Sequence, residues 1–230
     1  MSSSVAADQA RRPAVCGRMS LVIARPKSAE FGVAPVPETK SISRLRAAAQ
    51  TCRACPLWKN ATCAVFGEGP NSAKLIFVGE QPGDKEDRAG HPFVGPAGHL
   101  LDRALEAAGV DRDDCYITNA VKHFKWTPQG KRRLHAKPSA REVAACRPWF
   151  AAEMKAIAPR LVVCLGSTAS QQVLGKPIKV TQARGEKLDS EFGVPALITV
   201  HPSSLLRAMG QPDAEEQFGR FVADLKRLRG

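Results

Sequence analysis

Four short apolar runs alternate with longer segments in which apolar residues recur every three or four positions. The apolar runs occupy residues 75–78, 115–121, 161–165 and 196–200. Helical periodicity covers residues 99–108, 139–157, 167–174 and 214–228, and Ser41 or Ser43 can cap a further helix that runs to residue 49. Buried strands that alternate with amphipathic helices are typical of a parallel sheet covered on both faces. The pattern predicts an α/β fold with three layers, α/β/α, around a central, mostly parallel four-stranded sheet.

The two ends of the chain differ in character. Residues 1–40 are rich in Ser, Ala, Pro and Arg and lack sustained periodicity, which predicts a flexible tail. Residues 41–230 carry the strands and helices and are long enough for one domain with a real core. Ser139 and Glu142 have the spacing of a capping box at the start of the longest helix, and Pro159 ends it.

Polar residues follow three of the predicted strands where each strand ends. Glu80 and Gln81 follow the first strand, Asn119 lies near the end of the second, and His201 follows the fourth. Asn119 alone could cap a turn, and His201 alone could be an ordinary loop histidine. Because the carboxyl ends of parallel strands share one edge, we expect these side chains to form one pocket for a polar ligand.

Charge and composition limit the classes of binding partner and the cellular compartment to be expected. The formal net charge is +12, which favours a polyanionic partner such as nucleic acid or a membrane surface. No apolar run approaches the ~20 residues of a membrane span, and the first 20 residues lack a secretory core, so we expect no membrane association and a cytoplasmic protein. Seven cysteines in that compartment are not expected to form disulfides.

Four motifs then occur in a recognisable order. They are GEQPGDKED from Gly79, HPFVGPAGHLLDRAL from His91, ITNAVKH from Ile117 and HPSSLLR from His201. Together they resemble the uracil-DNA glycosylase superfamily, in particular its iron-sulfur branch, over residues 45–228. The stretch GKRRLH at residues 130–135 is similar to the signature loop of the UdgX-like group, whose members stay covalently joined to DNA.

The resemblance implies a role for each residue around a flipped uracil. Asn119 would read the Watson–Crick edge, since one amide offers both a donor and an acceptor. Phe93 would stack on the base, although core packing would be its ordinary role. Gln81 and Asp84 are also expected at the uracil. His201 would stabilise the oxygen O2 of the departing base.

Gln81 has no carboxylate that could activate water, which bears on the identity of the nucleophile. The best-known glycosylases of the superfamily carry a water-activating aspartate at this position, and an amide cannot act as a general base. The resemblance therefore implies that His135 attacks the sugar, with Glu80 orienting the imidazole and accepting its proton. Two alternatives stay open: a conventional hydrolytic glycosylase that turns over, and a non-catalytic DNA-binding module.

Two segments are expected to contact DNA, with single-stranded DNA preferred. The resemblance gives residues 205–207 a wedging role in the minor groove, and the phosphate contacts are expected from Lys131, Arg132, Arg133, Ser203, Ser204 and Arg207. A solvated basic loop is the alternative for residues 131–135. Asp84, Glu86 and Asp87 are either a tether for that loop or solvated acids.

The cysteines suggest a metal centre. Cys52 and Cys55 have a common metal-ligand spacing that is only moderately specific by itself. The resemblance adds His123, which stands where relatives place a third cysteine, and Cys146, and it implies a structural 4Fe-4S cluster held by the four residues. Zinc is the rival occupant. We expect a monomer, associated with the nucleoid, whose partner is uracil-containing DNA.

Overall fold

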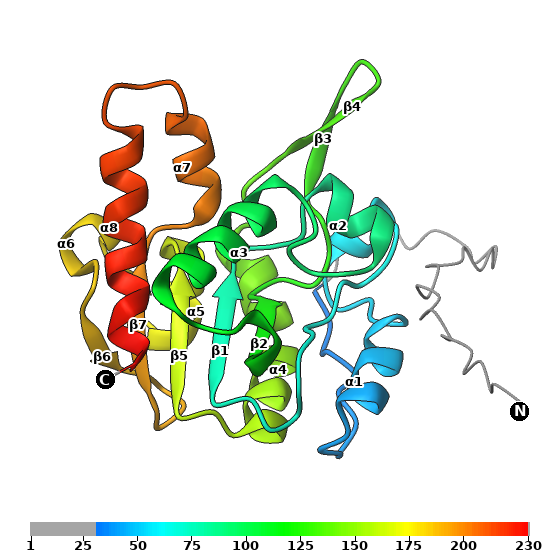
Figure 1. The fold of residues 1–230 in the computed structure, drawn as a ribbon. Coiled ribbons are helices and arrows are strands. Elements are labelled where there is room, and N and C mark those ends of the chain that lie inside the picture. The colour runs from blue at the N-terminus through cyan, green and yellow to red at the C-terminus, as the bar shows by residue number, and fades with distance from the viewer. Residues whose placement is uncertain (1–30, 230) are drawn as a thin grey trace, which may run out of the picture.

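The computed structural model describes residues 31–229, and its helices and strands alternate along the chain (Figure 1). The strands are β1 Leu75–Gly79, β2 Cys115–Asn119, β3 Trp126–Gln129, β4 Arg132–His135, β5 Leu161–Leu165, β6 Lys187–Asp189 and β7 Pro195–Thr199. The α-helices are α1 Ile42–Ala49, α2 Asp84–Ala89, α3 Pro96–Ala108, α4 Ala140–Ile157, α5 Ser167–Leu174, α6 Val180–Ala183, α7 Pro202–Ala208 and α8 Ala214–Lys226. Three short 3-10 helices are η1 Pro56–Lys59, η2 Arg112–Asp114 and η3 Arg227–Arg229.

The central sheet confirms the predicted α/β architecture but has one strand more than expected. Its order is β2-β1-β5-β7-β6, and the four predicted strands pair in parallel. The fifth strand, β6, runs antiparallel to β7 at the edge of the sheet. The prediction of four strands was wrong because β6 has only three residues, two of them exposed, and therefore carries no apolar run.

Helices cover both faces of this sheet, as the alternating pattern predicted. On one face, α1, α4 and α5 pack on side chains such as Ile76, Tyr116 and Val162. On the other face, α3, α7 and α8 pack on Phe77, Ile117, Val163 and their neighbours. The strand residues alternate between the two cores because successive side chains point to opposite faces.

Several polar stretches have more regular structure than their sequences suggested. Residues 84–89 form the short helix α2, and residues 130–135 belong to an antiparallel hairpin of β3 and β4, which projects from the sheet's carboxyl edge (Figure 1). The segment after His201 forms α7. Helix α3 begins three residues earlier than predicted, because Pro96 follows Gly95 and takes the first helical position.

The predicted tail lies mostly outside the described residues. Residues 31–40 have no helix or strand, and Phe31 and Val36 pack against the core beside α1. Within residues 31–229, none of the helices combines the length and apolar character required to cross a bilayer.

Candidate active site

Side chains expected at the carboxyl edge of the sheet meet around Gly79, the last residue of β1. A Cβ atom at this position would lie 2.3 Å from Asn119 Oδ1 and 2.6 Å from Phe93 Cζ. Only glycine leaves room there for the Asn119 amide and the Phe93 ring to meet. The Phe93 ring centroid also lies 6.0 Å from that of His201, so Asn119 at the end of β2 comes together with residues that follow β1 and β7.

Asn119 carries an unused hydrogen-bond acceptor. The side chain is 2% exposed, and its Oδ1 atom has no hydrogen-bond partner within the described part of the chain. A buried polar atom without a partner is costly, and it is expected where a ligand supplies the missing bond. The amide oxygen therefore suits a ligand with an N–H donor.

Phe93 has an unusual backbone conformation, in a loop whose end is bonded to a buried carboxylate. Its φ angle is 56°, a region that non-glycine residues seldom adopt. The buried carboxylate of Glu86 accepts hydrogen bonds from Gly83 N at 3.1 Å and Gly95 N at 2.7 Å. These two amides precede α2 and α3, so Glu86, within α2, links the start of its own helix to the end of the loop that presents Phe93.

His201 is placed as a neutral hydrogen-bond donor. Its Nδ1 atom accepts the main-chain N–H of Ser203 at 3.1 Å, so in the neutral ring the proton resides on Nε2. Burial, with smaller contributions from His135 and Arg207, lowers the pKa of His201 to about 4. At neutral pH the imidazole is therefore uncharged, with Nε2–H as its available donor.

Gln81 uses its amide on the hairpin that carries His135. Gln81 Oε1 accepts the main-chain N–H of Lys125 at 3.0 Å, which identifies the other amide atom as the NH₂ group. That nitrogen lies 3.1 Å from Lys125 O, 3.0 Å from Ala136 O and 2.9 Å from His135 Nε2. The expected contact of Gln81 with a base would therefore compete with this set of bonds.

The same contact favours one tautomer of His135. The Gln81 NH₂ group can only donate, so the contact is a hydrogen bond when His135 Nε2 is the acceptor and the ring proton lies on Nδ1; the two N–H hydrogens are then shared among three acceptors. The imidazole is 48% exposed, and its Nε2 atom lies 3.6 Å from Glu80 Oε1. Burial lowers the pKa of His135, although Glu80 opposes that shift. A neutral ring whose Nε2 atom faces Gln81 and Glu80 thus lies beside the end of β1.

Glu80 has a second partner, Thr168, which was not among the expected site residues. Its Oε2 atom accepts a short hydrogen bond from Thr168 Oγ1, near the start of α5. Thr168 follows β5 at the carboxyl edge, so its position, though not its residue type, was a usable signal. The bond holds the carboxylate beside His135.

Arg133 is turned toward the protein. Its guanidinium forms a short ion pair with Asp84 and a second one, at 2.6 Å, with the fully buried Asp87. Asp87 also accepts hydrogen bonds from Thr62 N at 2.9 Å and Thr62 Oγ1 at 2.6 Å. This arrangement matches the tether considered for the acidic residues. Lys131 and Arg132, at the hairpin tip, are exposed.

Helix α7 presents the second expected DNA contact. Ser203 and Ser204 hydrogen-bond to His201, and Arg207 Nη1 lies 3.5 Å from Ser203 Oγ. Leu205, in the segment expected to wedge into the minor groove, is buried in the core. Met209, at the end of α7, is 61% exposed and is the apolar side chain available there.

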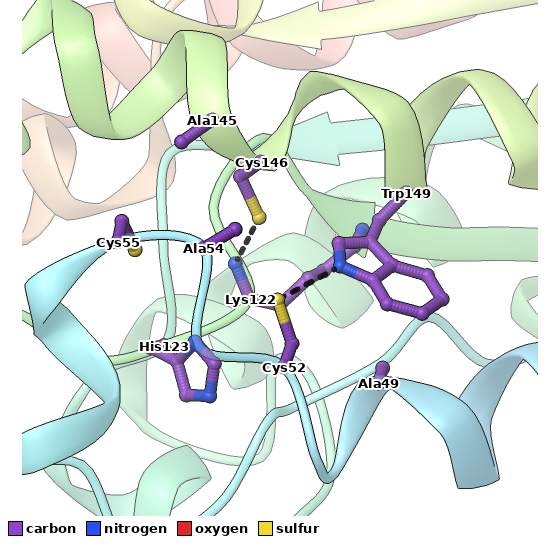
Figure 2. Close-up of a pocket in the computed structure, with 9 residues that line it drawn as sticks. All are labelled: Ala49, Cys52, Ala54, Cys55, Lys122, His123, Ala145, Cys146 and Trp149. Carbon is purple, nitrogen blue, oxygen red and sulfur yellow. Dashed lines mark hydrogen bonds between the residues drawn. The ribbon is translucent and has the colours of Figure 1, made fainter. Parts of the chain in front are cut away.

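The four expected metal ligands gather around one cavity. Figure 2 shows Cys52 and Cys55 on the segment after α1, His123 after β2 and Cys146 on α4. Trp149 Nε1 donates to Cys52 Sγ at 3.3 Å, and Lys122 N donates to Cys146 Sγ at 3.2 Å. Burial raises the pKa of Cys146 to about 12 and lowers that of His123 to about 4.

The donor atoms surround the cavity rather than meet at a point. Within residues 31–229, no three His, Cys, Asp or Glu side chains are arranged to hold a metal ion. A neutral imidazole and three thiols, two of which receive N–H···S bonds, still form a donor set suited to iron or zinc.

Comparison with known protein families and proteins identifies the fold. Residues 66–226 match the family model described as the uracil DNA glycosylase superfamily. The chain belongs to the uracil-DNA glycosylase superfamily.

Several relatives within this superfamily are similar over most of the chain. A type-4 uracil-DNA glycosylase of Thermotoga maritima is 43% identical over 157 residues, covering 68% of this chain and 78% of the relative. Type-4 uracil-DNA glycosylases of Sulfurisphaera tokodaii and Pyrobaculum aerophilum are 34% and 36% identical, covering 72% and 79% of this chain and 76% and 91% of theirs. The subgroup resemblance inferred from residues 130–135 is not tested by these similarities.

Proposed function

We propose that this uracil-DNA glycosylase superfamily member removes uracil from DNA and ends covalently joined to the abasic sugar through His135 Nε2. The type-4 uracil-DNA glycosylase relatives support uracil excision. One observation supports the covalent step: His135 Nε2 lies 2.9 Å from the Gln81 NH₂ group, which favours a lone pair on that nitrogen, and 3.6 Å from Glu80 Oε1.

The pocket offers a complementary partner for each polar edge of uracil. Asn119 Oδ1 accepts the base N3–H, and the same amide can donate to O4. His201 donates its Nε2–H to O2, which gains negative charge as the bond from base N1 to sugar C1′ breaks. Phe93 lies between these groups and stacks on the ring.

In the proposed chemistry uracil leaves as an anion and C1′ becomes electron-poor. The Nε2 lone pair of His135 forms the new bond to C1′ and gives up its hydrogen bond from Gln81, which leaves the imidazole positively charged. The Glu80 carboxylate faces that charge from the Nε2 side. With the ring proton on Nδ1, Glu80 stabilises the cation by its charge, and the proton passes from Nδ1 of the half-exposed ring to solvent.

A hydrolytic glycosylase that turns over is the second candidate, since the similarity to type-4 enzymes fits it equally. A denaturing gel separates the two after incubation with uracil-containing single-stranded DNA. We expect a slow protein–DNA band that is absent with thymine DNA and lost in His135→Ser. Free abasic DNA at many turnovers per protein, without such a band, would exclude the covalent proposal.

We further propose that Cys52, Cys55, His123 and Cys146 hold a 4Fe-4S cluster, which would crosslink the segment after α1 to α4 and β2. The donor set supports it, and ligands that surround a cavity suit a cluster of several atoms better than one zinc ion. Purified protein should contain about four irons per chain and absorb broadly in the visible range. His123→Cys should keep both signals, whereas Cys146→Ala should lose them, and zinc without iron would refute the assignment.

The remaining expectations about the protein's setting stay predictions. They are action as a monomer, preference for single-stranded DNA and association with the nucleoid. Size-exclusion chromatography coupled to light scattering tests the first, and release of uracil from matched single- and double-stranded substrates tests the second.

A further inference from the structure

A buried ion pair lies directly beneath the base-reading end of β2. Lys122 and Glu153 have side-chain exposures of 1% and 0%, and Lys122 Nζ lies 2.6 Å from Glu153 Oε2. Burying two charges requires strong compensation, and an apolar pair of similar size is often no less stable. The pair therefore calls for an explanation beyond core stability.

Each proton of the Lys122 ammonium has a defined acceptor. Besides Glu153, Nζ donates to Thr118 Oγ1 at 2.7 Å and to the main-chain oxygen of Asn119 at 2.8 Å. Three donors meet three acceptors, so the ammonium fixes the position of the Asn119 peptide. Asn119 is the residue whose amide oxygen is left free in the pocket.

The carboxylate of Glu153 is equally well satisfied. Its Oε1 atom accepts from Gly67 N at 3.1 Å, Tyr116 OH at 3.0 Å and Thr118 Oγ1 at 2.9 Å. These donors belong to the strand that carries Asn119 and to the segment before β1. Glu153 lies on α4, so the ion pair anchors the end of β2 to this helix.

Residue 122 also touches α4 at a second point, seven residues earlier, where its main-chain N–H donates to Cys146 Sγ. Lys122 thus both lines the cavity of the cysteines and binds the Asn119 peptide.

We propose that the Lys122–Glu153 ion pair positions Asn119 for the base, with Lys122 as the positioning residue and α4 as its anchor. This inference rests on the uracil-reading role proposed for Asn119. The pair acts through the Asn119 peptide, so its effect on uracil release depends on the Asn119 amide being present.

The test is a double-mutant cycle between the ion pair and Asn119. The pair variant is Lys122→Met with Glu153→Gln: the methionine keeps the volume of the lysine stem, and the new amide oxygen can still accept from Gly67, Tyr116 and Thr118. Both charges and the bond to Asn119 O are lost together, so no unpaired charge is left buried. The second arm of the cycle is Asn119→Ala.

Uracil release from single-stranded DNA is measured with protein in excess, for the wild type, both variants and their combination. We expect the pair variant to slow release at least about fivefold when Asn119 is present and less than about twofold in Asn119→Ala. Tyr116→Phe is the matched control, because it removes a donor from the same buried network without touching Asn119. It should lower the melting temperature and leave the release rate within about twofold.

If the pair variant lost the same factor in release rate with Asn119 present and in Asn119→Ala, its role would be merely structural and the proposal would be overturned. A pair variant that releases uracil at the wild-type rate would overturn it as well. The proposal would also fail if the pair variant lost its visible absorbance while Tyr116→Phe kept the iron content of the wild type. The ion pair would then act on the cysteine site. A wild-type protein that releases no uracil would instead refute the proposed function, and this inference would fall with it.

Discussion

At the scale of single residues, Gln81 decides what His135 can do. We predict that Gln81→Glu keeps the acceptor for Lys125 N but places a carboxylate beside His135 Nε2. A carboxylate favours a protonated Nε2, so the pKa of His135 should rise and its lone pair should become scarce. The covalent band should then form more slowly at pH 7, with the rate approaching a tenfold loss for each unit by which the pKa of His135 exceeds 7. The tautomer is read from nitrogen NMR of the imidazole, and an unchanged Nδ1–H form would contradict the assignment.

His201 makes a second prediction, which concerns pH. The folded protein keeps this imidazole neutral to about pH 4, whereas an unfolded chain protonates it near pH 6.5. Between these values the unfolded state binds more protons, so this contribution is complete above pH 6.5 and is lost as pH falls toward 4. His201→Gln should flatten the pH dependence of the unfolding free energy by up to about 3 kcal/mol over that range. Denaturant titrations of both proteins at pH 7 and pH 4.5 test the difference.

At the scale of elements, the loop between α2 and α3 depends on Glu86. We predict that Glu86→Gln cannot accept from Gly83 N and Gly95 N together, because one amide atom becomes a donor. The variant should lose about 1–3 kcal/mol of stability and bind uracil-containing DNA more weakly, as Phe93 leaves its strained conformation.

Glu106→Gln, on the exposed side of α3, is the control and should change neither quantity. If Glu86→Gln lowered stability but left binding unchanged, the loop would not depend on this carboxylate for its shape in the complex.

The hydrophobic pattern of the sequence predicted some strands and missed others. The runs that became β1, β2, β5 and β7 are apolar because both faces are covered, so pattern alone found them. Exposed β6 and the hairpin of β3 and β4 have no such burial. Their pairing depends on tertiary contacts, such as those of Gln81 and Arg133, that no local pattern encodes.

The site shows the same division. Glu80, Asn119 and His201 could be placed together because parallel strands bring their carboxyl ends to one edge. The partners Thr168, Glu86 and the buried ion pair could not, since each bond joins side chains whose separation depends on the finished packing. The sequence thus indicates which residues can meet the ligand, and the fold decides which residues hold them in place.

At the scale of the whole molecule, a net charge of +12 predicts DNA binding that weakens with salt. The basic residues of the hairpin differ in exposure: Lys131 and Arg132 are exposed, whereas Arg133 is paired with Asp84 and Asp87. Replacing Lys131 and Arg132 by Ala should reduce the slope of log affinity against log salt by about 1.4, if each neutralises one phosphate of single-stranded DNA.

Arg133→Met, in the same salt titration, distinguishes a contact of Arg133 with phosphate from its role in holding the hairpin in place. Because this guanidinium neutralises two carboxylates of its own chain, its loss should leave the salt slope nearly unchanged while slowing the His135 cross-link, since the hairpin loses its tether. Lys155→Ala with Lys176→Ala, two exposed lysines near the opposite edge of the sheet, should alter neither quantity. If Arg133→Met reduced the slope of log affinity against log salt by about 0.7, the value for one phosphate of single-stranded DNA, Arg133 would have to leave its carboxylates to bind DNA.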